Sequence, residues 1–212
     1  MALINFLEII GTIAFAISGA IVGIQRKLDI FGITFMAVTT AVGGGIFRDL
    51  IIGNIPPNAF KDPTFSLIAM GCAFLTCFFY NVICKFKLSI VLSDAIGLGV
   101  FTAIGSNAAL NNGINGTFAV IVMGLLTGVG GGILRDVFTK NIPFVFRKEI
   151  YAVACIIGSI VFCIIYPFTS RVIALYVTFI ITFSVRILSV KYDLNLPGAT
   201  KEITMSNEMA DA

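Results

Sequence analysis

The chain alternates long apolar runs with short polar turns. About 20 apolar residues cross the hydrocarbon core of a bilayer, and seven runs approach that length. They cover residues 3–24, 30–52, 64–84, 88–110, 117–138, 150–170 and 172–190. The pattern predicts an all-α membrane protein with seven transmembrane helices. We expect residues 1–190 to form a single transmembrane domain and the polar residues 191–212 to form a cytoplasmic tail.

A short phrase occurs twice, once in the second span and once in the fifth. It consists of three glycines, two apolar residues and an Arg-Asp pair. Its residues are Gly43, Gly44, Gly45, Arg48 and Asp49, and then Gly130, Gly131, Gly132, Arg135 and Asp136. Each glycine in a helix interior is unfavourable by roughly 1 kcal/mol relative to alanine. Charges at membrane depth are rare and usually functional. The doubled phrase therefore predicts a functional site.

The first and fourth spans also correspond to each other. Glu8, Gly11, Phe15 and Gly19 match Asp94, Gly97, Phe101 and Gly105 after one constant shift. We therefore expect two repeats, residues 3–87 and 88–170, with the seventh helix at 172–190 outside them. A repeat with three spans must enter the membrane from opposite faces in its two copies. This inverted plan is typical of transporters and related channels, with the functional site where the repeats meet.

The glycine triplets predict kinks in the second and fifth helices. Three residues without side chains allow a helix to bend and to expose backbone carbonyls. Such backbone is tolerated at membrane depth only where it is buried in protein or lines a watery cavity. A simpler role, close packing between helices, remains an alternative.

The charged residues of the two phrases need partners inside the membrane. Adjacent helical residues point about 100° apart, so we expect neither arginine to pair with the aspartate that follows it. A rise of about 1.5 Å per residue places Arg48 and Glu8 toward the outer face, and Arg135 and Asp94 toward the cytoplasm. We predict that Glu8 compensates Arg48 and that Asp94 compensates Arg135. Contact of Glu8 and Asp94 with headgroup water remains an alternative.

Composition and charge support a membrane protein and give its orientation. Only 12% of the 212 residues are charged, about half the share in soluble domains, and the mean hydropathy is +1.03. One side receives ten basic residues and the other only two. These are Arg26, Lys27, Lys85, Lys87, Lys140, Arg147, Lys148, Arg186, Lys191 and Lys201 against Lys61 and Arg171. We expect the inner membrane, with the N-terminus outside and the C-terminus in the cytoplasm.

Other function classes find little support in the residues. The chain has no histidine, which is the usual proton shuttle and the commonest metal ligand. Its five cysteines lack metal-ligand spacing. We therefore expect neither an enzyme nor a metal or cofactor site. The net charge of +3 is spread over the loops, so we expect no nucleic-acid partner.

Residues 3–190, with the paired glycine and Arg-Asp phrases on two three-span repeats, resemble the prokaryotic branch of the trimeric intracellular cation (TRIC) channels. Bacterial members are also labelled a glycine transporter family. The resemblance implies a homotrimer with one pore in each protomer, lined by the second and fifth helices. It implies that the six glycines form the kinks and that the Arg-Asp pairs surround the pore. It also implies permeation by monovalent cations, chiefly potassium.

Two functions are considered. The first, which the resemblance implies, is a potassium channel whose partners are its own copies and membrane lipids, and we expect lipid or charge pairs to gate it. The alternative, suggested by the inverted repeat, is a secondary transporter of glycine or a similar small zwitterion. A motif with few side chains beyond glycine offers weak coordination by backbone, which favours permeation over tight binding.

Overall fold

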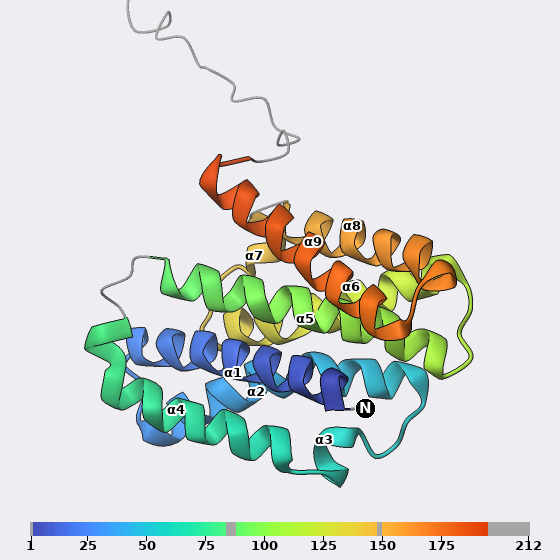
Figure 1. Cartoon of the computed structure of the whole chain (residues 1–212). Coiled ribbons are helices and arrows are strands. Elements are labelled where there is room, and N and C mark those ends of the chain that lie inside the picture. The colour runs from blue at the N-terminus through green and yellow to red at the C-terminus, as the bar shows by residue number, and fades with distance from the viewer. Residues whose placement is uncertain (1, 84–87, 148–149, 195–212) are drawn as a thin grey trace, which may run out of the picture.

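The computed structural model describes residues 2–83, 88–147 and 150–194 as a bundle of helices (Figure 1). The helices are α1 (Ala2–Gln25), α2 (Ile30–Ile52), α3 (Asn58–Lys61), α4 (Thr64–Ile83), α5 (Ser89–Asn111), α6 (Thr117–Phe138), α7 (Phe144–Arg147), α8 (Ile150–Ile165) and α9 (Arg171–Lys191), with a 3-10 turn at Tyr166–Phe168. Within this described part, seven helices are long and apolar enough to cross a membrane. The predicted all-α membrane fold is confirmed.

The helix ends follow from local chemistry. Asp29 precedes α2, and its side chain accepts a hydrogen bond from Gly32 N, which satisfies a free donor of the first turn. Gly53 ends α2 with φ of 82°, a left-handed conformation that glycine adopts without strain. Pro167 limits α8, because the predicted span over residues 150–170 ends in a 3-10 turn rather than continuing as α-helix.

α5 is the most enclosed helix, and it lies between α1 and α9 (Figure 1). It crosses α1 where Phe15 and Phe101 stack with ring centroids 5.3 Å apart. The corresponding glycines make room for this crossing, since a Cβ on Gly97 would overlap the Phe15 ring and one on Gly11 would approach Val100 to 2.6 Å. The correspondence between the first and fourth spans therefore reflects one helix crossing, to which each repeat contributes half.

The repeats place the two short helices at opposite ends of the bundle. α1, α2 and α4 form the first repeat, α5, α6 and α8 form the second, and α9 packs on α5 and α8 outside them. α3 follows the second span and lies near the N-terminus of α1 (Figure 1). α7 follows the fifth span, which runs in the opposite direction, so α7 lies at the other end of the bundle. The sequence pattern did not predict these two four-residue helices.

Several residues used to predict the orientation lie outside the described part of the chain. They are Lys85, Lys87, Lys148 and Lys201, and residues 195–212 of the expected tail lie there too. Arg186 is described, and it differs from the expectation of an interfacial charge. It is buried within α9.

Candidate functional site

The two glycine triplets meet where α2 crosses α6. A Cβ atom on Gly44 would overlap the carbonyl oxygen of Thr127, and one on Gly131 would overlap that of Thr40. The contact is reciprocal, because each middle glycine faces the carbonyl four residues before its counterpart. Backbone cannot turn aside as a side chain can, so these glycines permit close approach of two helices. Both helices remain α-helical through the triplets, with no unwound turn.

The flanking glycines have different surroundings. A Cβ on Gly43 would meet the flexible end of Leu134, and one on Gly132 would lie 2.9 Å from the Tyr151 hydroxyl. The nearest atom to a Cβ on Gly45 would be Arg48 Nη2, at 3.8 Å. Gly45 is therefore the triplet position with the most free space beside it, and that space belongs to a cavity described below.

Arg135 forms the centre of a buried ion cluster of Asp94, Arg135 and Asp136 from the second repeat and Ser18 from the first, and we call it the inner cluster after its predicted side of the membrane. Its Nη1 atom donates to Asp94 Oδ1 at 2.5 Å and to Ser18 Oγ at 2.6 Å, and its Nε donates to Asp136 Oδ1 at 2.9 Å. Arg135 is 0% exposed. The predicted pairing of Asp94 with Arg135 is confirmed. Two carboxylates around one guanidinium offset the desolvation of this charge.

The expectation that adjacent arginine and aspartate do not pair is wrong in both repeats. Arg48 Nε donates to Asp49 Oδ1 at 2.9 Å, and Arg135 repeats this contact with Asp136. Helix geometry fixes the direction of the Cβ atoms only. The arginine side chain is long enough to bend back and bring its guanidinium beside the neighbouring carboxylate.

Each aspartate of the phrase also fixes a short helix. Asp49 Oδ2 accepts from the backbone N–H of Asn58 at 2.7 Å, at the start of α3. Asp136 Oδ2 accepts from the backbone N–H of Phe144 at 3.0 Å, at the start of α7. These contacts satisfy a donor that a helix start leaves free. The Asn-Ile-Pro segment after each phrase thus folds back, so that the start of the short helix contacts the aspartate of that phrase.

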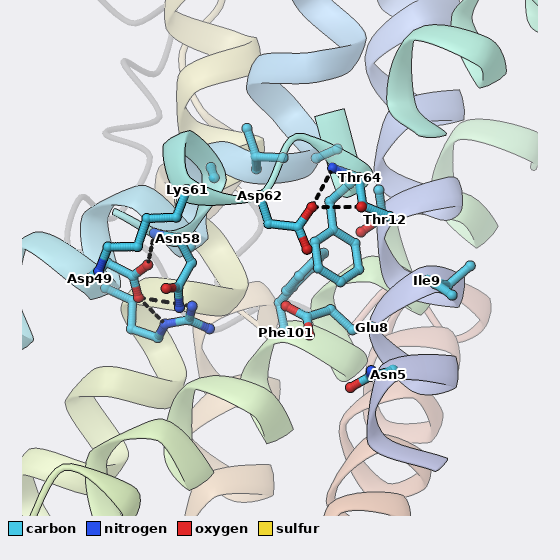
Figure 2. Close-up of a pocket in the computed structure, with 16 residues that line it drawn as sticks. Asn5, Glu8, Ile9, Thr12, Asp49, Asn58, Lys61, Asp62, Thr64 and Phe101 are labelled. Carbon is cyan, nitrogen blue, oxygen red and sulfur yellow. Dashed lines mark hydrogen bonds and ion pairs between the residues drawn. The ribbon is translucent and has the colours of Figure 1, made fainter. Parts of the chain in front are cut away.

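A cavity of about 560 Å³ lies mainly on the first repeat, and we call it the outer cavity because the predicted orientation puts it toward the outer face. Its lining residues are Asn5, Glu8, Ile9, Thr12, Ala41, Val42, Gly45, Arg48, Asp49, Asn58, Ala59, Lys61, Asp62, Thr64, Phe65 and Phe101. Figure 2 shows Glu8 of α1 pointing into this space, across from Asp49 and Asn58. The cavity thus extends from the loop after α2 to a glycine of the α2–α6 crossing.

The predicted ion pair between Glu8 and Arg48 is absent from the described residues. Both side chains line the outer cavity, but Arg48 makes its ion pair with Asp49, at 2.9 Å. The physical reason is that Asp49, held by the N–H of Asn58, is already beside the guanidinium. Glu8 is left as a carboxylate that faces a space large enough for a ligand or an ion.

Polar residues at the end of α3 and in the loop before α4 line the same cavity. Lys61 Nζ donates to Asn54 Oδ1 at 2.6 Å. Asp62 Oδ1 accepts from the backbone N–H of Thr64 at 2.9 Å and from its hydroxyl at 2.6 Å. These hydrogen bonds hold the pKa of Asp62 below the ordinary value of an aspartate, because they favour the charged form.

Sequence reasoning missed two residues beside the inner cluster. Tyr151 of α8 and Arg186 of α9 are 1% and 4% exposed, and the Arg186 guanidinium carbon lies 4.8 Å from the centre of the Tyr151 ring. The sequence signal available was Arg186 itself, a charge five residues inside an apolar span. Its position near the span's end made it resemble an interfacial residue.

The crossing helices and paired ion sites define a multi-pass membrane protein built from an inverted repeat. Residues 5–81 and 91–167 each match the glycine transporter family, and the two matches coincide with the two repeats. The UPF0126 inner membrane protein YadS of Escherichia coli (strain K12) is 40% identical over 92% of this chain and 95% of its own. The UPF0126 membrane protein YvgT of Bacillus subtilis is 37% identical over the same shares of the two chains. The chain belongs to this UPF0126 (glycine transporter) family.

Solved structures with the same fold are TRIC channels. The TRIC trimeric intracellular cation channel orthologue from Rhodobacter sphaeroides superposes with a TM-score of 0.86, at 32% identity over 92% of this chain and all of the other. A prokaryotic TRIC channel crystallised in 0.5 M KCl gives a TM-score of 0.85, at 36% identity over 91% and 98% of the two chains. The resemblance inferred from the doubled phrase is confirmed, and the fold is that of the TRIC channels.

Proposed function

We propose that the protein is a monovalent cation channel, chiefly for potassium, with one pore per protomer at the α2–α6 crossing. The observation that carries this proposal is the outer cavity. It extends from the α3 loop to Gly45 at the crossing, and five of its sixteen lining residues are charged although it lies within a membrane bundle. Polar walls at membrane depth are favoured where water or ions enter.

The charges of the outer cavity favour cations over anions. Its lining has three carboxylates, Glu8, Asp49 and Asp62, and two basic side chains, Arg48 and Lys61. An excess of one charge in a cavity with apolar walls concentrates counter-ions. Glu8 contributes most, because its carboxylate has no ion-pair partner in the described chain. The inner cluster closes the route on the other side of the crossing, so conduction requires that Arg135 and its partners separate.

Single-channel recording of purified protein in planar bilayers tests this function. Gly45→Leu places a side chain in the outer cavity without a backbone clash. We expect discrete currents that reverse near the potassium potential, with lower unitary conductance in this variant. Gly71→Leu is the matched control, because a Cβ on Gly71 of α4 has no atom within 4 Å and the residue lies outside the cavity lining. Equal conductance in the two variants would place the pore elsewhere, and silent bilayers would exclude a channel.

The finer parts of this function have separate tests. The reversal potential between potassium and sodium solutions measures selectivity, and we expect potassium to permeate better.

We propose that the protein is a homotrimer, as the Rhodobacter sphaeroides orthologue is named. Native mass spectrometry of the detergent-solubilised protein would report three chains, with bound phospholipid as added mass. A monomer that still conducts would limit the proposal to one pore per chain.

A second candidate is a secondary transporter of glycine or a similar small zwitterion. The observation in its favour is that Glu8 and Arg48, of opposite charge, line one cavity, so an ammonium and a carboxylate of one solute find complementary groups there. Saturable uptake of radiolabelled glycine into proteoliposomes, lost in Glu8→Gln, would favour the transporter. Unitary currents without such uptake would favour the channel.

A further inference from the structure

The seventh helix inserts a charge into the second repeat. Arg186 lies in α9, which belongs to neither repeat, and is 4% exposed. Its guanidinium carbon lies 4.8 Å from the centre of the Tyr151 ring, within the range of a cation–π contact. A charge inside an apolar bundle is unfavourable unless it has a partner. The Tyr151 ring is therefore the group that holds Arg186 at this depth.

Tyr151 in turn reaches the inner cluster. A Cβ on Gly132 would lie 2.9 Å from the Tyr151 hydroxyl, and 3.8 Å from both Asp94 Oδ1 and Arg135 Nη2. These three polar atoms therefore surround one point beside the glycine triplet. A chain of contacts runs from α9 through the Tyr151 ring of α8 to the ion pair that joins α5 and α6. A shift of the ring would move the hydroxyl that lies beside this pair.

The first repeat lacks this chain of contacts. Phe65 is the second residue of α4, as Tyr151 is the second residue of α8. Phe65 lines the outer cavity, and within residues 2–83, 88–147 and 150–194 no cation lies over its ring. α9 packs on α5 and α8, and among the described helices none packs on α4 in the corresponding way. The two repeats share the Arg-Asp phrase, and in the described residues the repeat that α9 contacts has the more enclosed arginine.

We propose that Arg186 is a positioning residue that acts through Tyr151. It holds the tyrosine against Asp94 and Arg135, and this keeps the inner half of the pathway closed. The role deepens the proposed channel function and rests on it. Arg186 contacts neither the outer cavity nor the permeating ion. Its loss changes how often the pathway opens, and the conductance of the open pathway stays the same.

Recordings of four variants test this role. Arg186→Met removes the charge at similar volume, Tyr151→Leu removes the ring, and the third variant carries both changes. We expect roughly tenfold higher open probability in each single variant, the scale of one buried cation–π contact, at unchanged unitary conductance. The double variant matches either single one, because both changes break the same contact. Arg171→Met, on the exposed first turn of α9, serves as control and behaves as the intact protein.

Conservative variants separate positioning from folding. Arg186→Lys keeps a cation over the ring and restores most of the closure. Tyr151→Phe keeps the ring and loses the hydroxyl. We expect this variant to fold, because a phenylalanine, Phe65, already occupies the corresponding position of α4. We expect an intermediate open probability in Tyr151→Phe. Additive effects of Arg186→Met and Tyr151→Leu, or no rescue by lysine, overturn the proposal.

A readout that needs no conduction distinguishes this inference from the channel proposal. Cys155 is 0% exposed and lies one turn after Tyr151 on α8. With the other four cysteines replaced by serine, a small methanethiosulfonate reagent should modify Cys155 at least tenfold faster in Arg186→Met than in Arg171→Met. Faster labelling in a protein that passes no current supports the positioning role and rejects the channel. Normal currents with equal labelling reject the positioning role alone.

Discussion

Two neighbouring glycines should respond in opposite ways to the same added methyl group. A Cβ on Gly44 would overlap the carbonyl oxygen of Thr127, which is backbone and moves only if α2 and α6 separate. A Cβ on Gly45 would have its nearest neighbour, Arg48 Nη2, at an ordinary 3.8 Å. Alanine gains up to about 1 kcal/mol over glycine inside a helix, and this gain applies to both sites. The difference between the variants therefore isolates the overlap, which costs about 1–3 kcal/mol.

Thermal unfolding of Gly44→Ala and Gly45→Ala in detergent, followed by circular dichroism, measures this difference. For a chain of this length it corresponds to a gap of about 2–12 °C between the two midpoints, with Gly45→Ala at or above the intact protein. The second repeat provides an independent copy of the test, since Gly131→Ala would overlap the carbonyl of Thr40. Equal midpoints, or greater damage at Gly45, would refute close packing as the reason for the triplets. Such a result would favour the kink.

Three further predictions concern single groups and the orientation. Asp94→Asn should destabilise the protein by about 3–5 kcal/mol in thermal or denaturant unfolding, because it leaves Arg135 buried without one partner, whereas Glu8→Gln, which breaks no ion pair, should stay within about 1 kcal/mol. Asp62→Ala should lower the unfolding midpoint at pH 7, and the gap should close as pH falls through the lowered pKa of Asp62, because the hydrogen bonds from Thr64 favour the charged carboxylate. Green fluorescent protein fused to the C-terminus should fluoresce in cells, while alkaline phosphatase fused there should be inactive; the opposite pair of results would place the C-terminus outside.

Much of the fold followed from the sequence because hydrocarbon imposes simple rules. The length of each apolar run sets the span, and helix boundaries in the structure fall within a few residues of those expected, except where Pro167 shortens the sixth span. The inverted repeat followed from the odd number of spans, three, in each copy of the repeat. The pairing of Asp94 with Arg135 followed from depth alone, because a buried arginine needs a carboxylate at its own level.

The same reasoning failed for Glu8, and the reason lies in a local contact. Depth placed Glu8 level with Arg48, but the guanidinium bends back to Asp49, whose carboxylate is fixed by the N–H of Asn58. Counting residues along a helix gives the depth of a side chain. It cannot show that the segment after Asn-Ile-Pro folds back and places the N–H of Asn58 beside Asp49. Arg186 and Tyr151 were missed for a related reason. Their contact joins the consecutive helices α8 and α9, and α9 lies outside the repeats, so comparing the two repeats gave no hint of it.

The differences between the two repeats explain why their sites differ although the phrase is the same. Both arginines bind the following aspartate, and both aspartates hold a short helix. Arg135 has four additional neighbours, since Asp94 and Ser18 bind its Nη1, the centre of the Phe144 ring lies 5.3 Å from its guanidinium carbon, and Tyr151 lies beside its cluster. Around Arg48 the corresponding carboxylate is turned to a cavity and the corresponding ring is a phenylalanine. An inverted repeat with identical sites would be open or closed alike at both faces. Among the described residues, the rings of Tyr151 and Phe144, the Ser18 hydroxyl and the packing of α9 are the additional groups at the inner cluster, so the proposed pathway would be controlled at that end.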